Sequence, residues 1–144
     1  GSECIMRIVG LLLIIAGLML GIGSNLPVFI DPPSVIIVLT FTVGALWLSG
    51  TSIPLMVRAL SGGELSAGDR SAAAAGWELA GRASVAAGYV GVLVGAVIML
   101  RHVDDIGAIG PGLAICILTA LYGIVVGYGI CLPCQRYVES AQSA

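Results

Sequence analysis

The sequence predicts an all-α, polytopic membrane protein with four transmembrane helices. Its composition is 58% hydrophobic and 10% charged, and its mean hydropathy of +1.09 lies outside the range of soluble domains. Four apolar stretches are each long enough to cross a bilayer core about 30 Å thick. Most of the 21 glycines are scattered through these stretches, a distribution typical of membrane helices that pack closely. The bilayer is therefore expected to be the main solvent of this chain.

The first predicted span covers residues 6–23, which start at Arg7 and end before the polar pair Ser24-Asn25. The alternative for this stretch is a signal peptide, but no small-residue cleavage site follows it, and a short turn leads into another apolar run. Residues 1–5 precede the first methionine. They are interpreted as a processed leader or a segment added to the protein, and residues 6–144 are predicted to form a single membrane domain.

The second predicted span covers residues 34–56 and is introduced by the segment Asp31-Pro32-Pro33. A proline suits the first turn of a helix because the N–H that it lacks would have no partner within the helix. The sequence therefore predicts a short outer turn between the first two spans.

The third and fourth predicted spans form a second helical pair. The third covers residues 84–100 and stops at Arg101-His102, and the fourth covers residues 106–132. Pro111, near the start of the fourth span, is expected either to sit in its opening turn or to kink it.

A loop of residues 58–82 separates the two pairs and is predicted to be cytoplasmic. Within it, Ser66 and Asp69 have the spacing of a capping box, and an alanine-rich helix follows. Glu78 and Arg82 are four residues apart in the favourable orientation for an ion pair on a helix. We expect this helix to run on into the third span.

The placement of the arginines predicts the orientation of the chain. Arg101 alone lies on one side of the predicted spans, and the remaining arginines lie on the other side: Arg7, Arg58, Arg70, Arg82 and Arg136. Cytoplasmic segments are enriched in positive charge, so both termini are predicted to be cytoplasmic. The net charge of −2 leaves no basic patch, which argues against nucleic acid as a partner.

Small residues at helical spacing predict where helices pack. Glycines four residues apart lie on one face of a helix and permit close contact, although such pairs also arise by chance in a glycine-rich chain. Three pairs occur: Gly17/Gly21, Gly91/Gly95 and Gly123/Gly127. Gly88 extends the pair in the third span to a stripe, which suits a neighbouring helix of the same or another subunit.

The spans contain no Asp, Glu, Lys or His, and Arg7 is at the very start of the first, so the chain alone has no titratable relay through the hydrocarbon. A single histidine without metal-spaced partners offers neither a catalytic triad nor a zinc site. The sequence therefore predicts a protein that is not an enzyme and needs no cofactor.

Three short motifs leave alternatives open. Cys131 and Cys134 form a C-x-x-C that can be redox active or supply half a zinc site, but small sulfur residues are also common at apolar helix ends. His102 is interpreted as a solvated turn residue, with pH sensing as the alternative. Asp104 and Asp105 are interpreted as a solvated turn, with attraction of cations to a pore mouth as the alternative.

Two segments carry a family resemblance. Residues 29–39 read Phe-Ile-Asp-Pro-Pro-Ser-Val-Ile-Ile-Val-Leu, and residues 109–123 read Ile-Gly-Pro-Gly-Leu-Ala-Ile-Cys-Ile-Leu-Thr-Ala-Leu-Tyr-Gly and lead to Leu132-Pro133. These segments, with the glycine stripe of the third span, resemble the MotA/PomA subunits of the bacterial flagellar stator, relatives of the TolQ and ExbB proteins. The resemblance covers most of the chain except the cytoplasmic loop.

The resemblance implies a homopentamer in the bacterial inner membrane that surrounds a single-span, MotB-like partner. The membrane aspartate of such a partner carries the ion, which would explain why this chain has no carboxylate in its spans. The residues implied for the ion pathway or the partner contact are Thr119, Ser84, Ala86 and Tyr122. The residues implied for helix packing are Gly88, Gly91, Gly95, Gly123 and Gly127.

Two departures from the family pattern bear on function. The family's third span begins with Ala-Pro, often followed by Thr, whereas Ser84, Val85 and Ala86 stand here. The family also inserts a large cytoplasmic domain between the second and third spans, where this chain has only residues 58–82. Contacts with a flagellar rotor by that domain are therefore not expected.

These observations support two hypotheses of different classes. In the first, the chain is a stator-like subunit that lets protons pass at its interface with the single-span partner. In the second, it is a structural membrane oligomer that does not conduct. A third reading, an enzyme or redox carrier that uses Cys131 and Cys134, rests on the C-x-x-C alone.

Overall fold

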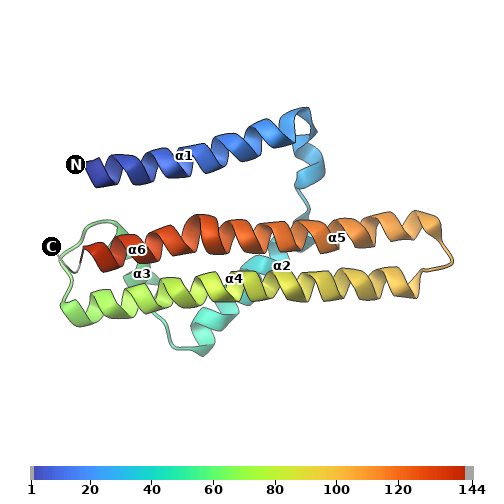
Figure 1. The fold of residues 1–144 in the computed structure, drawn as a ribbon. Coiled ribbons are helices and arrows are strands. Elements are labelled where there is room, and N and C mark those ends of the chain that lie inside the picture. Colours follow the sequence, from blue (N-terminus) through green and yellow to red (C-terminus); the bar gives the residue numbers. More distant parts are fainter. Residues whose placement is uncertain (1, 142–144) are drawn as a thin grey trace. The chain divides into compact units, whose positions relative to one another are not determined.

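The computed structural model describes residues 2–141, and over these residues the chain is helical without a β-strand. The all-α class predicted from the sequence is confirmed. The backbone divides into two compact units, Gly1–Pro32 and Pro33–Ala144. The elements, shown in Figure 1, are α1 (Ser2–Ile22), η1 (Gly23–Phe29), α2 (Pro32–Leu48), α3 (Ile53–Leu60), α4 (Ala67–Arg101), α5 (Ile106–Ile124), η2 (Val125–Cys131) and α6 (Leu132–Ser140).

The first unit is an apolar helix followed by a 3-10 helix. α1 ends at Ile22, close to the predicted end of the first span at residue 23. Gly23 has a φ of +57°, a left-handed conformation that glycine adopts without steric cost, and it begins η1. Among the residues searched in this unit, the apolar helical stretch is Val9–Asn25.

The second predicted span is not a single helix. α2 ends at Leu48, and α3 follows after a break at which the helix direction changes by 104°. Gly50 has a φ of +69° in this break, and Pro54 stands in the first turn of α3, where its missing N–H costs nothing. The helix over the second predicted span, residues 34–56, is therefore broken after Leu48, and whether both parts belong to one span stays a prediction.

α4 confirms the helix that the capping box predicts. Ser66 is its N-cap: the Ser66 hydroxyl oxygen accepts a hydrogen bond from the Asp69 N–H at 3.1 Å and donates one to Asp69 Oδ2 at 2.8 Å. The helix then continues for 35 residues through the third predicted span and ends at Arg101. At 1.5 Å per residue it is about 52 Å long, which exceeds the thickness of a hydrocarbon core.

α5, η2 and α6 form one continuous helical rod with a π-helical segment in the middle. In η2 the backbone bonds reach five residues back, as in the bond from the Leu132 N–H to the Gly127 carbonyl. Pro111 lies inside α5, near its start. The rod extends past the predicted end of the fourth span at residue 132 and reaches Ser140.

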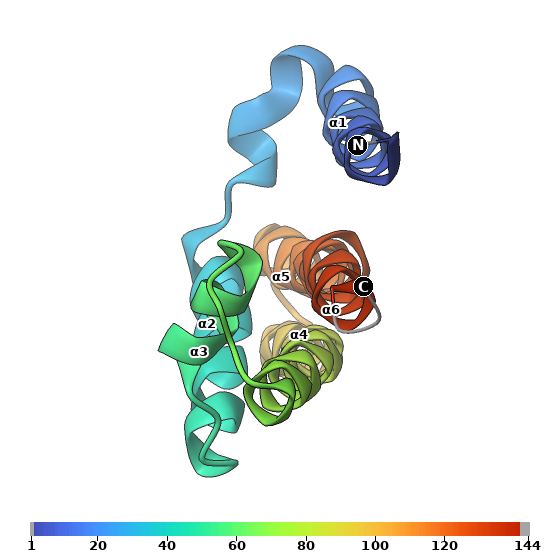
Figure 2. The same cartoon turned by 90° about the vertical axis from the view of Figure 1, so that its left-hand side faces the viewer.

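In the second unit, α4 lies antiparallel beside the α5–α6 rod, and α2 and α3 lie along one side of this pair (Figure 2). A small core joins α3, α4 and α6 at the end where α4 begins. Its buried members are Ala59, Ala73, Ala74 and Val138. Beside it the Trp77 indole N–H donates to the Met56 carbonyl at 3.3 Å. Much of the segment predicted as a loop, residues 58–82, is therefore packed helix.

The described residues contain two helical stretches that are long and apolar enough to cross a membrane, Ala67–Arg101 and Ile109–Ser140. The bent pair α2 and α3 qualifies as a third stretch if its two helices are taken together. The chain is thus an all-α membrane protein, and the count of four spans stays a prediction.

Candidate functional site

Three hydroxyl side chains are completely buried in the apolar second unit. Ser34, Ser84 and Thr119 each have 0% of their surface exposed, and they come from α2, α4 and α5 respectively. A hydroxyl group buried among apolar side chains needs a hydrogen-bond partner to offset its lost hydration. Each of the three helices therefore brings one polar group to an interface with the others.

Thr119 joins α5 to α2. Its hydroxyl oxygen lies 2.9 Å from Ser34 Oγ and 2.6 Å from the carbonyl oxygen of Ile115, one turn earlier in α5. A hydroxyl group has a single hydrogen, so these two acceptors share it or compete for it. The bond to Ile115 is the backbone bond that threonine commonly makes within a helix.

A second pair joins α4 to α2. Ser84 Oγ lies 3.0 Å from Thr42 Oγ1 and donates to the Ala80 carbonyl at 2.8 Å. The Thr42 hydroxyl oxygen also lies 2.7 Å from the Val38 carbonyl oxygen. Each hydroxyl group has a single hydrogen, so the contact between Ser84 and Thr42 competes with the bonds to the two backbone carbonyls. As in the first pair, a hydroxyl group contacts one carbonyl oxygen of its own helix and one hydroxyl group of another helix.

We call the two pairs together the hydroxyl seam, which consists of Ser34, Thr42, Ser84 and Thr119. Ser34 and Thr42 are eight residues apart in α2, so they lie on one face of this helix about 12 Å apart along its axis. The two pairs therefore join α2 to α5 and to α4 at two positions along the axis of α2. Within α2 and α5 there is no Asp, Glu, Lys, Arg or His, so the seam is neutral.

The predicted packing glycines lie between α4 and α5 of the same chain. A Cβ added at Gly91 would overlap Thr119 Cγ2 and Cβ and lie 2.7 Å from its hydroxyl oxygen. A Cβ at Gly95 would lie 2.6 Å from Cys116 Sγ, and one at Gly123 would lie 2.5 Å from the Ser84 carbonyl oxygen. The glycines thus bring the backbones of the two helices together.

The remaining two packing glycines also lie where α4 meets the rod, Gly88 against α5 and Gly127 of η2 against α4. A Cβ at Gly88 would lie 3.3 Å from Ala120 Cα, and one at Gly127 would lie 2.9 Å from the Gly81 carbonyl oxygen. Because the stripe on α4 is covered by α5, these glycines serve contact inside one subunit.

Of the four residues expected on the ion pathway, the structure brings Thr119 and Ser84 into the seam. Ala86, two residues after Ser84, instead lies half-buried beside Tyr89 and Tyr128 in a groove on the outer side of α4. Tyr122, three residues after Thr119, is half-buried in α5. Ala86 therefore lies apart from Thr119 and Ser84.

The sequence analysis did not single out Ser34 and Thr42 as site residues. Their signal is present: they are polar residues two helical turns apart in an apolar helix, and this spacing places both on one face. Their partners are 85 and 42 residues away in the chain, so no local pattern pairs them.

The other motifs have structural contacts. The Asp105 carboxylate caps α5 by accepting from the Gly107 N–H at 2.9 Å, and His102 Nδ1 lies 3.0 Å from the Ile98 carbonyl oxygen. Cys131 is buried and Cys134 half-buried, both as free thiols. Among the residues searched in the described part of the chain, no group of His, Cys, Asp and Glu could hold a metal ion.

No family model matches the chain. It is 33% identical over 66 residues to "Motility protein A" of Aquifex aeolicus (strain VF5), which covers 46% of this chain and 26% of that relative. It is 43% identical over 53 residues to "Chemotaxis protein PomA" of Vibrio alginolyticus, and 41% identical over 54 residues to "Motility protein A" of Cereibacter sphaeroides.

The last two matches cover 37% and 38% of this chain and 21% of each relative. The chain thus matches about a quarter or less of the length of these curated relatives. The resemblance predicted from the sequence is confirmed by these matches. This all-α membrane protein is therefore MotA-like over a stretch of 53 to 66 residues.

Proposed function

We propose that the chain is a stator-like membrane subunit that forms a pentameric ring around a single-span partner and couples proton flow to movement. In this proposal the chain is not an enzyme, and it lies in the bacterial inner membrane with both termini in the cytoplasm. The similarity to proteins named for motility and chemotaxis supports this assignment.

The observation that carries the proposal is a neutral hydroxyl seam in spans without an acidic or basic group. Hydroxyl groups can donate to a carboxylate and accept from its protonated form, but they do not themselves take up a proton near neutral pH. A chain of this kind can line a proton path only if another chain supplies the titrating group. A partner with one membrane aspartate meets that need.

Thr119 and Ser84 would line the ion path, and Tyr122 would contact the partner. In the single chain Gly91 covers the Thr119 side chain, and Ser34 accepts its hydrogen bond. Thr119 would therefore have to exchange Ser34 for the partner carboxylate, through a small movement of α5 against α2. Such an exchange conserves the number of hydrogen bonds on the hydroxyl group.

A second candidate is a structural membrane oligomer that does not conduct. The observation in its favour is that Thr119 and Ser84 have no exposed surface and are already bonded within the chain. In this case the seam serves only to hold α2 against α4 and α5.

The two candidates differ in proton flux. The tagged chain is purified from its native membrane, the single-span protein that accompanies it is identified by mass spectrometry, and both are placed in vesicles that contain a pH-sensitive dye. Under an imposed membrane potential, flux is expected with both proteins together and not with either alone. Thr119→Val, which keeps the shape and removes the hydroxyl, is expected to slow the flux, and Thr119→Ser to retain most of it.

Equal flux in the wild-type chain and in Thr119→Val would remove Thr119 from the path. Absence of flux with every single-span protein that accompanies the chain would favour the structural oligomer.

A further inference from the structure

The second unit has a groove on the outer side of α4, formed against η2 and α6. Its volume is about 530 Å³. The side chains along it change in character from one end to the other. The polar end has Glu78, Arg82, Gln135 and Arg136, and the apolar end has Val85, Ala86, Tyr89, Tyr128 and Leu132.

The polar end of the groove lies at the level of the lipid headgroups. Between Arg82 and Arg101, α4 has 18 residues without an acidic or basic side chain, which at 1.5 Å per residue is about 27 Å. This length matches a hydrocarbon core of about 30 Å, so Arg82 marks one boundary of the bilayer. Arg136 is the first charged residue of the α5–α6 rod after Asp105, and it lies at the same end of the groove as Arg82.

Both guanidinium groups are available to a ligand. The side chain of Arg82 is 77% exposed, and that of Arg136 is 71% exposed. Each is paired with a glutamate of its own helix, Arg82 with Glu78 at 2.6 Å and Arg136 with Glu139 at 3.8 Å. Exposed ion pairs of this kind contribute little to stability, and a guanidinium has five N–H donors, of which these contacts use few.

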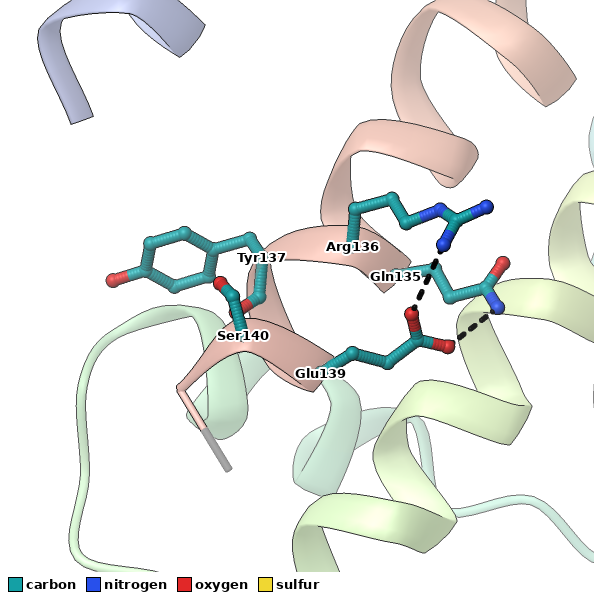
Figure 3. Close-up of polar contacts among 5 residues, drawn as sticks. All are labelled: Gln135, Arg136, Tyr137, Glu139 and Ser140. Carbon is teal, nitrogen blue, oxygen red and sulfur yellow. Dashed lines mark hydrogen bonds and ion pairs between the residues drawn. The ribbon is translucent and has the colours of Figure 1, made fainter. Parts of the chain in front are cut away.

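Figure 3 shows the contacts that Arg136 and Gln135 make with Glu139. Glu139 receives a hydrogen bond from the Gln135 side-chain amide at 2.8 Å on one carboxylate oxygen, and the longer contact from Arg136 on the other. Gln135 thus already satisfies part of the Glu139 carboxylate. An approaching phosphate would compete for Arg136 against a contact that is long for an ion pair.

We propose that this groove binds an anionic phospholipid of the surrounding bilayer. Its phosphate would lie between Arg82 and Arg136, and one acyl chain would lie along Val85, Ala86 and Tyr89. A free phosphate ion would contact only the polar end. A phospholipid would contact both ends, with its phosphate at the polar end and its acyl chain at the apolar end. Basic pockets between membrane helices on the cytoplasmic side are a known way to recognise anionic headgroups.

The fluorescence of a tryptophan in the groove can report the binding of lipid. Trp77 lines the groove, and the second tryptophan, Trp47, belongs to α2. In a Trp47→Phe chain the fluorescence of Trp77 is measured in phosphatidylcholine vesicles with increasing amounts of phosphatidylglycerol brominated near the head of its acyl chains. Brominated phosphatidylcholine is the comparison lipid. We expect phosphatidylglycerol to quench Trp77 at a lower mole fraction than phosphatidylcholine does.

Charge variants test where the preference arises. Arg82→Gln and Arg136→Gln are each expected to lower the preference for phosphatidylglycerol by roughly fivefold. Arg101→Gln is the matched control, because it removes the same charge from the other end of α4, and it should leave the preference unchanged. Glu78→Gln should raise the preference, because it releases Arg82 from its ion pair.

The remaining outcomes would each overturn the proposal. Equal quenching by the two lipids would show that the groove does not select an anion. An equal loss in Arg101→Gln would assign the effect to overall charge. Relief of the quenching by inorganic phosphate would identify a free anion site. Absence of quenching by any brominated lipid, in a preparation where the chain is oligomeric, would identify another copy of the chain as the occupant.

Discussion

At the scale of single residues, Thr119 takes part both in hydrogen bonding and in close packing between helices. Its hydroxyl group lies within bonding distance of Ser34 and of the Ile115 carbonyl, and its methyl group fills the space opposite Gly91. A substitution at any of these positions therefore changes the surroundings of the Thr119 side chain. The neighbouring pair of Ser84 and Thr42 repeats the polar part of this arrangement.

The Ser34 and Thr119 hydroxyls are expected to be energetically coupled. Ser34→Ala and Thr119→Val should each lower the free energy of unfolding in detergent by about 0.5–1.5 kcal/mol, and the double variant should lose less than the sum. Ser34→Ala combined with Ser84→Ala serves as the control, because these residues bond different partners and should be additive within about 0.5 kcal/mol. Additivity in the first pair would mean that the contact between Ser34 and Thr119 contributes nothing.

Gly91 is expected to tolerate no side chain. Gly91→Ala places a Cβ inside the Thr119 side chain, so it should destabilise the chain by about 1–3 kcal/mol and lower the midpoint of thermal unfolding followed by circular dichroism. Gly68→Ala is the control in the same helix, since its Cβ would lie 3.8 Å from Ser66 Oγ, an ordinary contact. An unchanged midpoint in Gly91→Ala would show that α4 and α5 are not as close as described.

At the scale of helices, the local sequence predicts α4 but does not predict the bend between α2 and α3. The capping box at Ser66 and the run of apolar residues up to Arg101 predict α4 well, because both signals are local. Residues 49–52 read Ser-Gly-Thr-Ser, a polar interruption too short to end a span that is predicted from a long hydropathy window. The break there depends on the backbone conformation of Gly50. The partners in the hydroxyl seam are separated by many residues, so their pairing follows only from the packing of three helices.

The bend predicts a particular labelling pattern for α3. In a chain without its native cysteines, cysteine is introduced in turn at four successive positions and reacted with a water-soluble maleimide. Val57 and Arg58 are exposed, and cysteine there should react quickly. Met56 and Ala59 are buried against α4 and α6, and cysteine there should react slowly. We propose that α3 lies outside the hydrocarbon, and uniform protection across α3 would contradict this proposal.

At the scale of the whole molecule, α4 is long and apolar enough to cross a membrane, so its two ends are expected on opposite faces. We propose that the end with the loop at Glu64 is cytoplasmic and the end with Val103 is outside. A maleimide that cannot cross membranes should therefore label Val103→Cys in intact cells and label Glu64→Cys only after the cells are opened. Both positions are exposed in the described chain. The reverse pattern would overturn the orientation derived from the arginines.

The assembly proposal predicts a mass. In mild detergent, native mass spectrometry should give a particle of five chains of 14.6 kDa, with or without the single-span partner. Gly91→Ala should weaken this particle only as far as it unfolds the subunit, because Gly91 packs inside one chain. A particle of a single chain in the wild-type protein would contradict the ring.

The length of α4 has a mechanical consequence. The helix carries Ser84 and Gly91 in its membrane half, and Ala73 and Ala74 in the small core of its other half. Because α4 is one continuous helix, a tilt about a point near Arg82 would move its two halves in opposite directions. A tilt of about 10° in the membrane half would move the first residue of α4 by roughly 4 Å. A small rearrangement at the hydroxyl seam would thus cause a larger displacement where α4 packs on α3 and α6.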